Sequence, residues 1–106
     1  MKNKNTLDLF PAECGFDKDT GRLFTFLYMP KDGKDYYVYA SCDEIDVQTN
    51  NIIDFSLEFY DTIDSVIPLD MKYDKEMFDE LEATCYDLFY STVDEMILDK
   101  RMYQWN

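Results

Sequence analysis

The chain contains no histidine and has only three glycines and three prolines among its 106 residues. Without histidine it lacks the most common general base, the base of Ser-His-Asp and Cys-His pairs, and the most common zinc ligand. Its glycines stand apart at Gly15, Gly21 and Gly33, so no glycine-rich loop is present to cradle a phosphate. In a chain with 23 acidic residues, carboxylate pairs occur at every spacing by chance and do not single out a glycosidase. We therefore expect a protein that is not an enzyme.

Basic residues are scarce as well. Against 23 Asp and Glu stand only 10 Lys and Arg, which gives a formal net charge of −13 and a sequence pI of about 4.1. Because phosphates and anionic lipids are bound by Lys and Arg, this balance argues against direct contact with nucleic acid or with a membrane surface. The charge favours a cation or a basic protein groove as the partner.

Long apolar runs are also missing. No segment reaches the roughly 18 apolar residues of a transmembrane helix, and the first ten residues, MKNKNTLDLF, lack the apolar run of a signal peptide. The three cysteines form an odd set without a secretory signal, which is typical of a reducing compartment. These features predict a cytoplasmic protein.

The residues that are present suit a small folded domain with an uneven charge. At 46% hydrophobic and 17% aromatic residues, the chain can build one core, which predicts a single domain over 1–106. Residues 1–53 hold 9 acids and 6 bases, whereas residues 54–106 hold 14 acids and 4 bases. The second half therefore carries most of the negative charge.

Alternating residues predict a β-hairpin in the first half of the chain. The segment 22–29 (RLFTFLYM) is apolar on both faces, which predicts a central strand that is covered on both sides. Asp32 and Gly33 form a hairpin-turn dipeptide. The strand that follows, 36–42 (YYVYASC), completes the predicted pair.

Further strands are predicted on either side of this hairpin. The segment 7–16 predicts a short strand, which Pro11 confines to a sheet edge because proline cannot donate a ladder hydrogen bond. The polar segment 42–51 predicts a loop. The segment 52–61 (IIDFSLEFYD) alternates between apolar and polar residues and predicts a half-buried strand with an acidic outer face.

The remaining residues predict a helix that starts after Asp74, a suitable N-cap, with Glu76 in the first turn. Apolar residues recur every three or four positions along one stripe: Phe78, Leu81, Cys85, Leu88, Thr92 and Met96. Met77, Phe89, Val93 and Ile97 widen the stripe. Ser91 and Thr92 weaken its middle, so a break into two helices stays open. The order of the elements predicts an α+β fold, with an antiparallel sheet of three to four strands and the C-terminal helix packed on one face.

Three cysteines, Cys14, Cys42 and Cys85, are candidate metal ligands. A helix packed across the sheet can bring them together, and a carboxylate such as Glu13 or Asp43, or a water, can complete a structural zinc site. The usual close spacing of zinc ligands is missing, however. The alternative is that the cysteines are small apolar core residues and that the protein has no cofactor.

Acidic and aromatic side chains are the candidate partner-binding residues. Tyr37, Tyr39 and Tyr60 lie on the predicted outer strand faces, and tyrosine is a frequent anchor at protein interfaces. Carboxylates on the outer faces of strand and helix can imitate a phosphate backbone to a groove rich in Lys and Arg. These carboxylates belong to Asp54, Glu58, Asp79, Glu80, Glu82 and Asp87. The alternative is that the acids only keep the protein soluble.

In composition, and in runs such as DKEMFDELEATCYDLFYSTVDE (74–95), the chain resembles the small acidic proteins that phages and mobile elements encode against host defence. These include anti-restriction DNA mimics, uracil-glycosylase inhibitors and anti-CRISPR proteins. The resemblance implies a non-enzymatic inhibitor of a basic nucleic-acid-handling protein, above all a CRISPR effector nuclease in the cytosol of the host cell. It aligns no functional residue, and these families share no common fold. The alternative function is an immunity-type or accessory protein that binds a basic toxin or another cellular partner.

Overall fold

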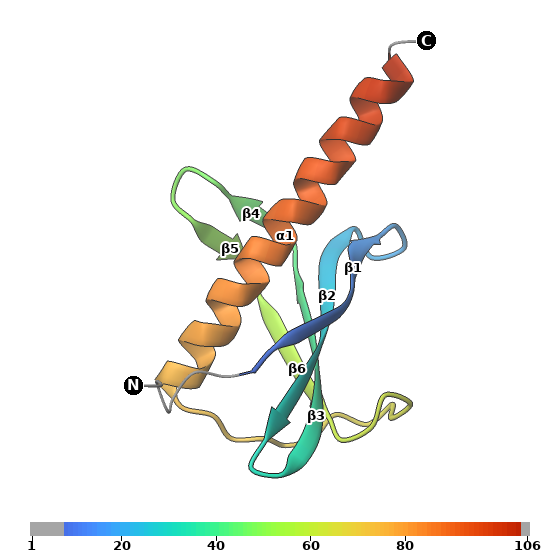
Figure 1. Cartoon of the computed structure of the whole chain (residues 1–106). Helices are drawn as coiled ribbons and strands as arrows, with labels where there is room; N and C mark the ends of the chain where they lie inside the picture. Colours follow the sequence, from blue (N-terminus) through green and yellow to red (C-terminus); the bar gives the residue numbers. More distant parts are fainter. Residues whose placement is uncertain (1–7, 105–106) are drawn as a thin grey trace.

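A single long helix crosses one face of a four-stranded antiparallel sheet (Figure 1). This computed structural model describes the backbone of residues 8–104 and the side chains of residues 8–96. The sheet has the strand order β1-β2-β3-β6, and β4 and β5 form a separate hairpin. The elements are β1 (Phe10–Asp17), β2 (Arg22–Lys31), β3 (Lys34–Cys42), β4 (Glu44–Asp46), β5 (Asn51–Ile53), β6 (Ser56–Tyr60) and α1 (Lys75–Gln104). The predicted α+β class is confirmed.

The β2–β3 hairpin follows from its turn residues. Asp32 and Gly33 both have positive φ values, of 54° and 76°, which a two-residue turn of type I′ requires. The turn sets the register in which Leu27 lies opposite Val38. In β1, Pro11 lies on the outer strand of the sheet, as predicted, and an irregularity in the pairing follows it.

The core lies between the sheet and α1. One face of β2 and β3 contributes side chains such as Leu27 and Val38, and α1 contributes Leu81 and Phe89; all four are 0% exposed. Phe55, in the turn before β6, packs edge-on against Phe89 with ring centroids 6.3 Å apart. The apolar stripe of α1 is therefore buried against the strands, as amphipathic periodicity requires.

The expectation that β2 is covered on both sides is wrong. Phe24, Phe26 and Tyr28, which alternate with the core residues, stay partly exposed. Within residues 8–104, α1 covers only the opposite face, as Figure 1 shows. The aromatic rings on the uncovered side pack against one another instead, which explains why an apolar pattern persists there without a second covering layer.

The segments around β4 and β5 differ from expectation in two ways. The predicted loop 42–51 is mostly the β4–β5 hairpin, in which Ile45 pairs with Ile52. The predicted strand 52–61 is divided because Asp54 has a positive φ of 57° and turns the chain between β5 and β6. Ile53 is consequently 40% exposed and does not join the core face.

Helix α1 is continuous over its described length. The Asp74 carboxylate accepts a hydrogen bond from the backbone N–H of Met77 at 2.9 Å, which confirms the predicted N-cap. The break considered near Thr92 does not occur, because α1 runs without interruption from Lys75 to Gln104. The Thr92 hydroxyl donates to the Leu88 carbonyl one turn earlier, at 2.9 Å. Despite its length, α1 is not apolar enough in its described part to cross a membrane.

The packing predicts that the Phe89 ring is a major source of stability. Phe89→Ala should lower the free energy of unfolding by about 3–5 kcal/mol, because the ring is fully buried and a cavity would remain. Val66, which is 87% exposed, supplies the control: Val66→Ala should change the value by less than about 0.5 kcal/mol. Urea unfolding followed by circular dichroism measures both. Equal effects of the two substitutions would contradict the described core.

Candidate functional site

The predicted partner-binding residues lie on two different sides of the molecule. Glu58, like Tyr37, Tyr39 and Tyr60, belongs to the sheet face that α1 does not cover. The helix acids Asp79, Glu80, Glu82 and Asp87 lie on α1, outside its buried stripe. The structure therefore does not unite the predicted residues in one surface, and each surface has to be considered by itself.

The outer side of α1 is an acidic surface, here called the acidic helix face. At 100° per residue, the positions farthest from the buried stripe are close to Ala83. The helix segment 75–96 carries seven carboxylates and one amine, that of Lys75. The carboxylates belong to Glu76, Asp79, Glu80, Glu82, Asp87, Asp94 and Glu95.

Lys75 neutralises little of this surface. Its ammonium lies 2.9 Å from the Asp79 carboxylate, one helical turn away, and this hydrogen bond raises the pKa of Lys75. Its side chain is 89% exposed, and such exposed pairs contribute little because water and salt screen them. The acidic helix face thus keeps a strong negative field.

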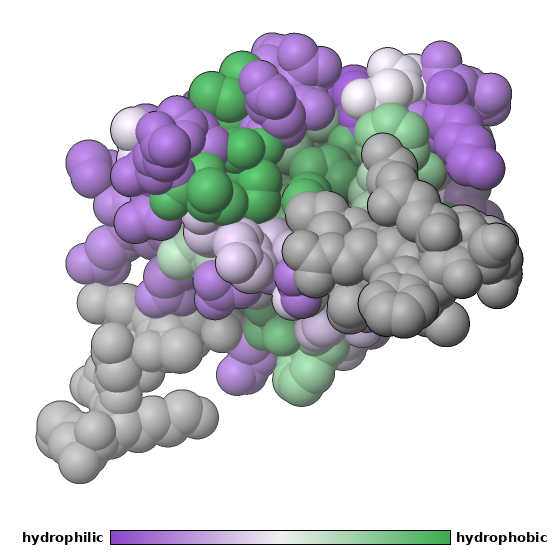
Figure 2. Space-filling model, turned by 90° about the horizontal axis from the view of Figure 1, so that it is seen from above, coloured by the Kyte–Doolittle hydropathy of each residue, from purple (hydrophilic) through white to green (hydrophobic). Residues whose placement is uncertain are grey.

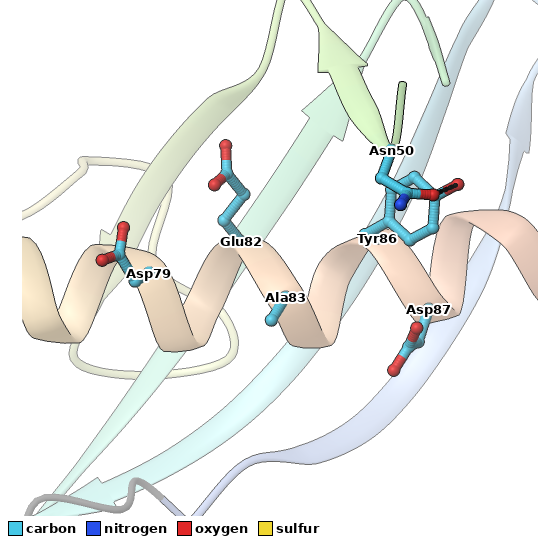
Figure 3. Close-up of a pocket in the computed structure, with 6 residues that line it drawn as sticks. All are labelled: Asn50, Asp79, Glu82, Ala83, Tyr86 and Asp87. Atoms are coloured by element: carbon cyan, nitrogen blue, oxygen red, sulfur yellow. Dashed lines mark hydrogen bonds between the residues drawn. The ribbon is translucent and has the colours of Figure 1, made fainter. Parts of the chain in front are cut away.

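An open groove of about 450 Å³ lies along this face. Its lining residues are Asn50, Asp79, Glu82, Ala83, Tyr86 and Asp87 (Figure 3). In Figure 3, Glu82 and Tyr86 extend from one side of α1, and Ala83 and Asp87 from the other. Tyr86 donates a hydrogen bond to the Asn50 side chain at 3.3 Å, which links α1 to the turn between β4 and β5. Three carboxylates around a hollow suit a cationic side chain of a partner.

A second hollow, of about 420 Å³, lies between the β4–β5 hairpin and α1 and is mainly apolar. Its lining residues are Leu23, Glu44, Ile45, Val47, Tyr90, Val93 and Asp94. Viewed from above, hydrophobic residues gather at the hairpin side of the molecule and are bordered by hydrophilic ones (Figure 2). This groove adjoins the C-terminal part of the acidic helix face through Asp94.

The uncovered sheet face carries a ladder of aromatic rings, here called the aromatic face. It comprises Phe10, Phe24, Phe26, Tyr28, Tyr37, Tyr39 and Tyr60. Ring centroids lie 5.6 Å apart between Tyr28 and Tyr37, 6.0 Å apart between Phe26 and Tyr37, and 5.9 Å apart between Phe24 and Tyr39. These are ordinary distances for interacting rings. The face is therefore a preformed aromatic surface.

Carboxylates surround the tyrosines of the aromatic face. The Tyr28 hydroxyl donates to Asp35 at 2.7 Å, and this hydrogen bond raises the pKa of Tyr28. Burial, followed by the nearby Glu58 carboxylate, raises the pKa of Tyr60. Burial, followed by nearby carboxylates, also raises the pKa of Tyr39. The phenols consequently stay protonated at neutral pH and can donate hydrogen bonds.

Asp54 is already engaged inside the molecule. The Arg22 guanidinium lies 2.7 Å from its carboxylate and also donates to the Asp54 carbonyl at 2.8 Å. The same guanidinium is within hydrogen-bond distance of the Ser41 hydroxyl, at 3.3 Å. Asp54 thus fixes the bend between β5 and β6, and its charge is partly compensated within the chain.

The three cysteines lie on the side of the sheet that α1 covers, but they differ in exposure. Cys42 and Cys85 are 0% exposed, and burial raises their pKa values to about 11 and about 12. Cys14 is exposed, with its sulfur 3.0 Å from the Thr25 hydroxyl. Among the described residues, no group of three or more Cys, His, Asp or Glu side chains is arranged to hold a metal. The zinc site stays a prediction, and the two buried thiols have the character of core residues.

Comparison of the chain with protein-family models, curated proteins and solved structures finds no match. The function is therefore inferred from the chain's own residues. Sequence reasoning missed Phe24 and Phe26 as surface residues because it placed them under a covering layer. The available signal was the number of helices: one helix of this length can cover only one face of a four-stranded sheet.

The burial of the cysteines predicts a sharp difference in reactivity. In the folded protein at pH 8, iodoacetamide should modify Cys14 alone, because Cys42 and Cys85 are buried and protonated. Mass spectrometry of the intact protein should show one adduct, and three after unfolding in urea. Rapid modification of Cys85 in the folded state would contradict the described packing.

Proposed function

We propose that this protein is a non-enzymatic inhibitor that binds a basic nucleic-acid-handling protein through the acidic helix face. The target that we favour is a CRISPR effector nuclease in the cytosol of a host cell, where the inhibitor occupies a groove that otherwise holds nucleic acid. The observation that carries this proposal is the run of seven carboxylates along residues 75–96 of α1, opposed by one amine. The resemblance in composition to anti-defence inhibitors supports the same target class.

The linear charge density of the helix supports mimicry of a nucleic-acid strand. From Glu76 to Glu95, α1 rises by about 28 Å, at 1.5 Å per residue. Averaged over this length, the helix carries one carboxylate per 4–5 Å of axis, roughly, compared with about 3.4 Å for the phosphates of one DNA strand. The spacing is uneven, with a gap of about 10 Å between Asp87 and Asp94. A groove built for phosphates would meet a comparable field on a rigid rod.

The helix also provides rigidity, which a mimic requires. Packing of Leu81 and Phe89 against the sheet fixes the direction of α1, and the Asp74 cap fixes its start. The backbone positions that carry the carboxylates are thus fixed before binding, so less backbone conformational entropy is lost on association. Long-range attraction between the −13 chain and a basic groove should accelerate the encounter and make it sensitive to salt.

The proposal predicts inhibition of DNA cleavage that weakens as salt rises. The purified protein should slow cleavage by a susceptible CRISPR nuclease when it is added before the DNA, because both compete for one basic groove. Affinity should fall between about 50 and 200 mM salt, over which electrostatic complexes of this kind lose strength. Unchanged cleavage across a panel of such nucleases would refute the proposed target.

Charge reversal locates the contact. The triple variant Asp79→Lys, Glu82→Lys, Asp87→Lys should weaken binding to the nuclease about tenfold or more, because it reverses the charges that line the groove on α1.

A matched control separates local contact from overall charge. The variant Asp19→Lys, Asp64→Lys, Asp70→Lys changes the net charge by the same amount at exposed positions outside α1. It should retain most of the affinity in the same surface-plasmon-resonance assay. Equal losses in both variants would show that only net charge matters and that α1 is not the contact.

A further inference from the structure

The aromatic face lacks a covering element in the part of the chain that the structure describes, residues 8–104. The segment that follows β6 does not cover it, since Leu69 pairs with Phe59 and packs with the core on the other side. Phe10 is 53% exposed, and the other rings of this face are partly exposed. Aromatic side chains gathered on one accessible surface are a recognised mark of an interaction site. This face lies across the sheet from α1 and is independent of the acidic helix face and of the function proposed for it.

The charges around the aromatic face define the chemistry of its partner. Three carboxylates interact with its tyrosines: Asp35 and Glu58 through hydrogen bonds, and Asp17 by its charge on Tyr39. The strand register places one basic residue of β2, Arg22, on this face, and Arg22 already forms an ion pair with Asp54. The lysines of the β2–β3 turn belong by register to the other face. A partner therefore meets aromatic rings and carboxylates that form no ion pair with the described residues.

Two other occupants fit this surface poorly. A second copy placed face to face would bring Glu58 and Asp35 of each chain against a surface of the same sign, in a protein with a net charge of −13. Single-stranded nucleic acid stacks on aromatic residues, but its binding sites track the backbone with basic grooves. The described face offers one arginine, and that arginine is engaged.

We propose that the aromatic face binds a protein segment that carries arginine side chains. A guanidinium group is planar and weakly hydrated, so it stacks on the rings of Tyr37, Tyr39 or Phe26. Its donors can at the same time pair in a bidentate manner with Glu58 or Asp35. Lysine has a compact, strongly hydrated ammonium and lacks the planar fork, so the face prefers arginine over lysine at equal charge.

Two synthetic peptides of equal length and charge test the preference. They are six Arg-Gly repeats and six Lys-Gly repeats, titrated into the isotope-labelled full chain by NMR. The arginine peptide should bind about fivefold more tightly or better, which corresponds to one additional stacked cation. Its chemical-shift changes should centre on the rings of Tyr37 and Tyr39, whereas the lysine peptide should affect mainly α1.

Conservative variants separate the ring from the charge. Tyr39→Leu should abolish most of the preference for arginine, whereas Tyr39→Phe, which keeps the ring, should retain it. Glu58→Gln should weaken arginine binding with little change in shape. Tyr90→Leu, at a 48% exposed position on α1, is the matched control and should leave the preference unchanged. Thermal unfolding verifies that each variant is folded. If a variant does not fold, the comparison of the two peptides on the unaltered protein still decides whether the face prefers arginine.

Three results would overturn the proposal. Equal affinity for the two peptides, with shifts confined to α1, would show unspecific attraction to an acidic protein. Binding of a twelve-residue oligothymidine on the aromatic face would identify a nucleic-acid platform. A dimer in sedimentation that Tyr39→Leu dissociates would identify a second copy as the occupant. The charge reversals on α1 test the proposed nuclease inhibition, and the peptide titrations test arginine binding by the aromatic face. Either proposal can therefore fail without the other.

Discussion

The contact between the apolar stripe of α1 and one face of the sheet is the constraint on which the other features depend. Leu81, Cys85 and Phe89 are fully buried in this contact, and with their partners on β2 and β3 they form most of the core. Because the described residues contain one helix, and that helix packs on one face of the sheet, no helix is left to cover the other face. The same contact that stabilises the fold therefore turns the acids of α1 outward and leaves the aromatic rings uncovered on the far side.

Electrostatic self-repulsion shapes what remains on the surface. A net charge of −13 on 106 residues opposes a compact fold, and the three described ion pairs each have at least one well-exposed partner. Stability must then come from apolar packing, to which the edge-on contacts of the Phe55 ring with Phe78 and Phe89 contribute. The three described ion pairs offset only a small part of the cost that the acids impose on folding, which is understandable if the benefit of the acids arises on binding a basic partner.

Local signals in the sequence predicted most of the fold. Asp32-Gly33 fixed the hairpin, Pro11 marked the outer strand and Asp74 marked the start of the helix, since each acts through its own backbone geometry or capping hydrogen bond. The β4–β5 hairpin was missed because its strands are only three residues long, and because the positive φ of Asp54, which the residue type does not reveal, separates β5 from β6. The candidate residues were found individually, but their division onto two sides depends on which face α1 covers. The apolar character of Phe24 and Phe26 suggested burial because a sequence does not distinguish rings that pack under a helix from rings that pack against each other.

The two outer strands of the sheet have a further consequence for how this protein meets others. At β1, Pro11 lacks a backbone donor and the pairing register shifts beside it; at β6, Phe59 accepts a hydrogen bond from the N–H of Leu69 at 2.6 Å. Both edges are therefore poor templates for the addition of a foreign strand, which is the usual route to edge-to-edge aggregation. A binding partner is therefore expected to contact side chains on the two faces of the molecule and not the backbone of its edge strands. The partly exposed aromatic rings are thereby offered to partners without an open strand edge beside them that invites self-association.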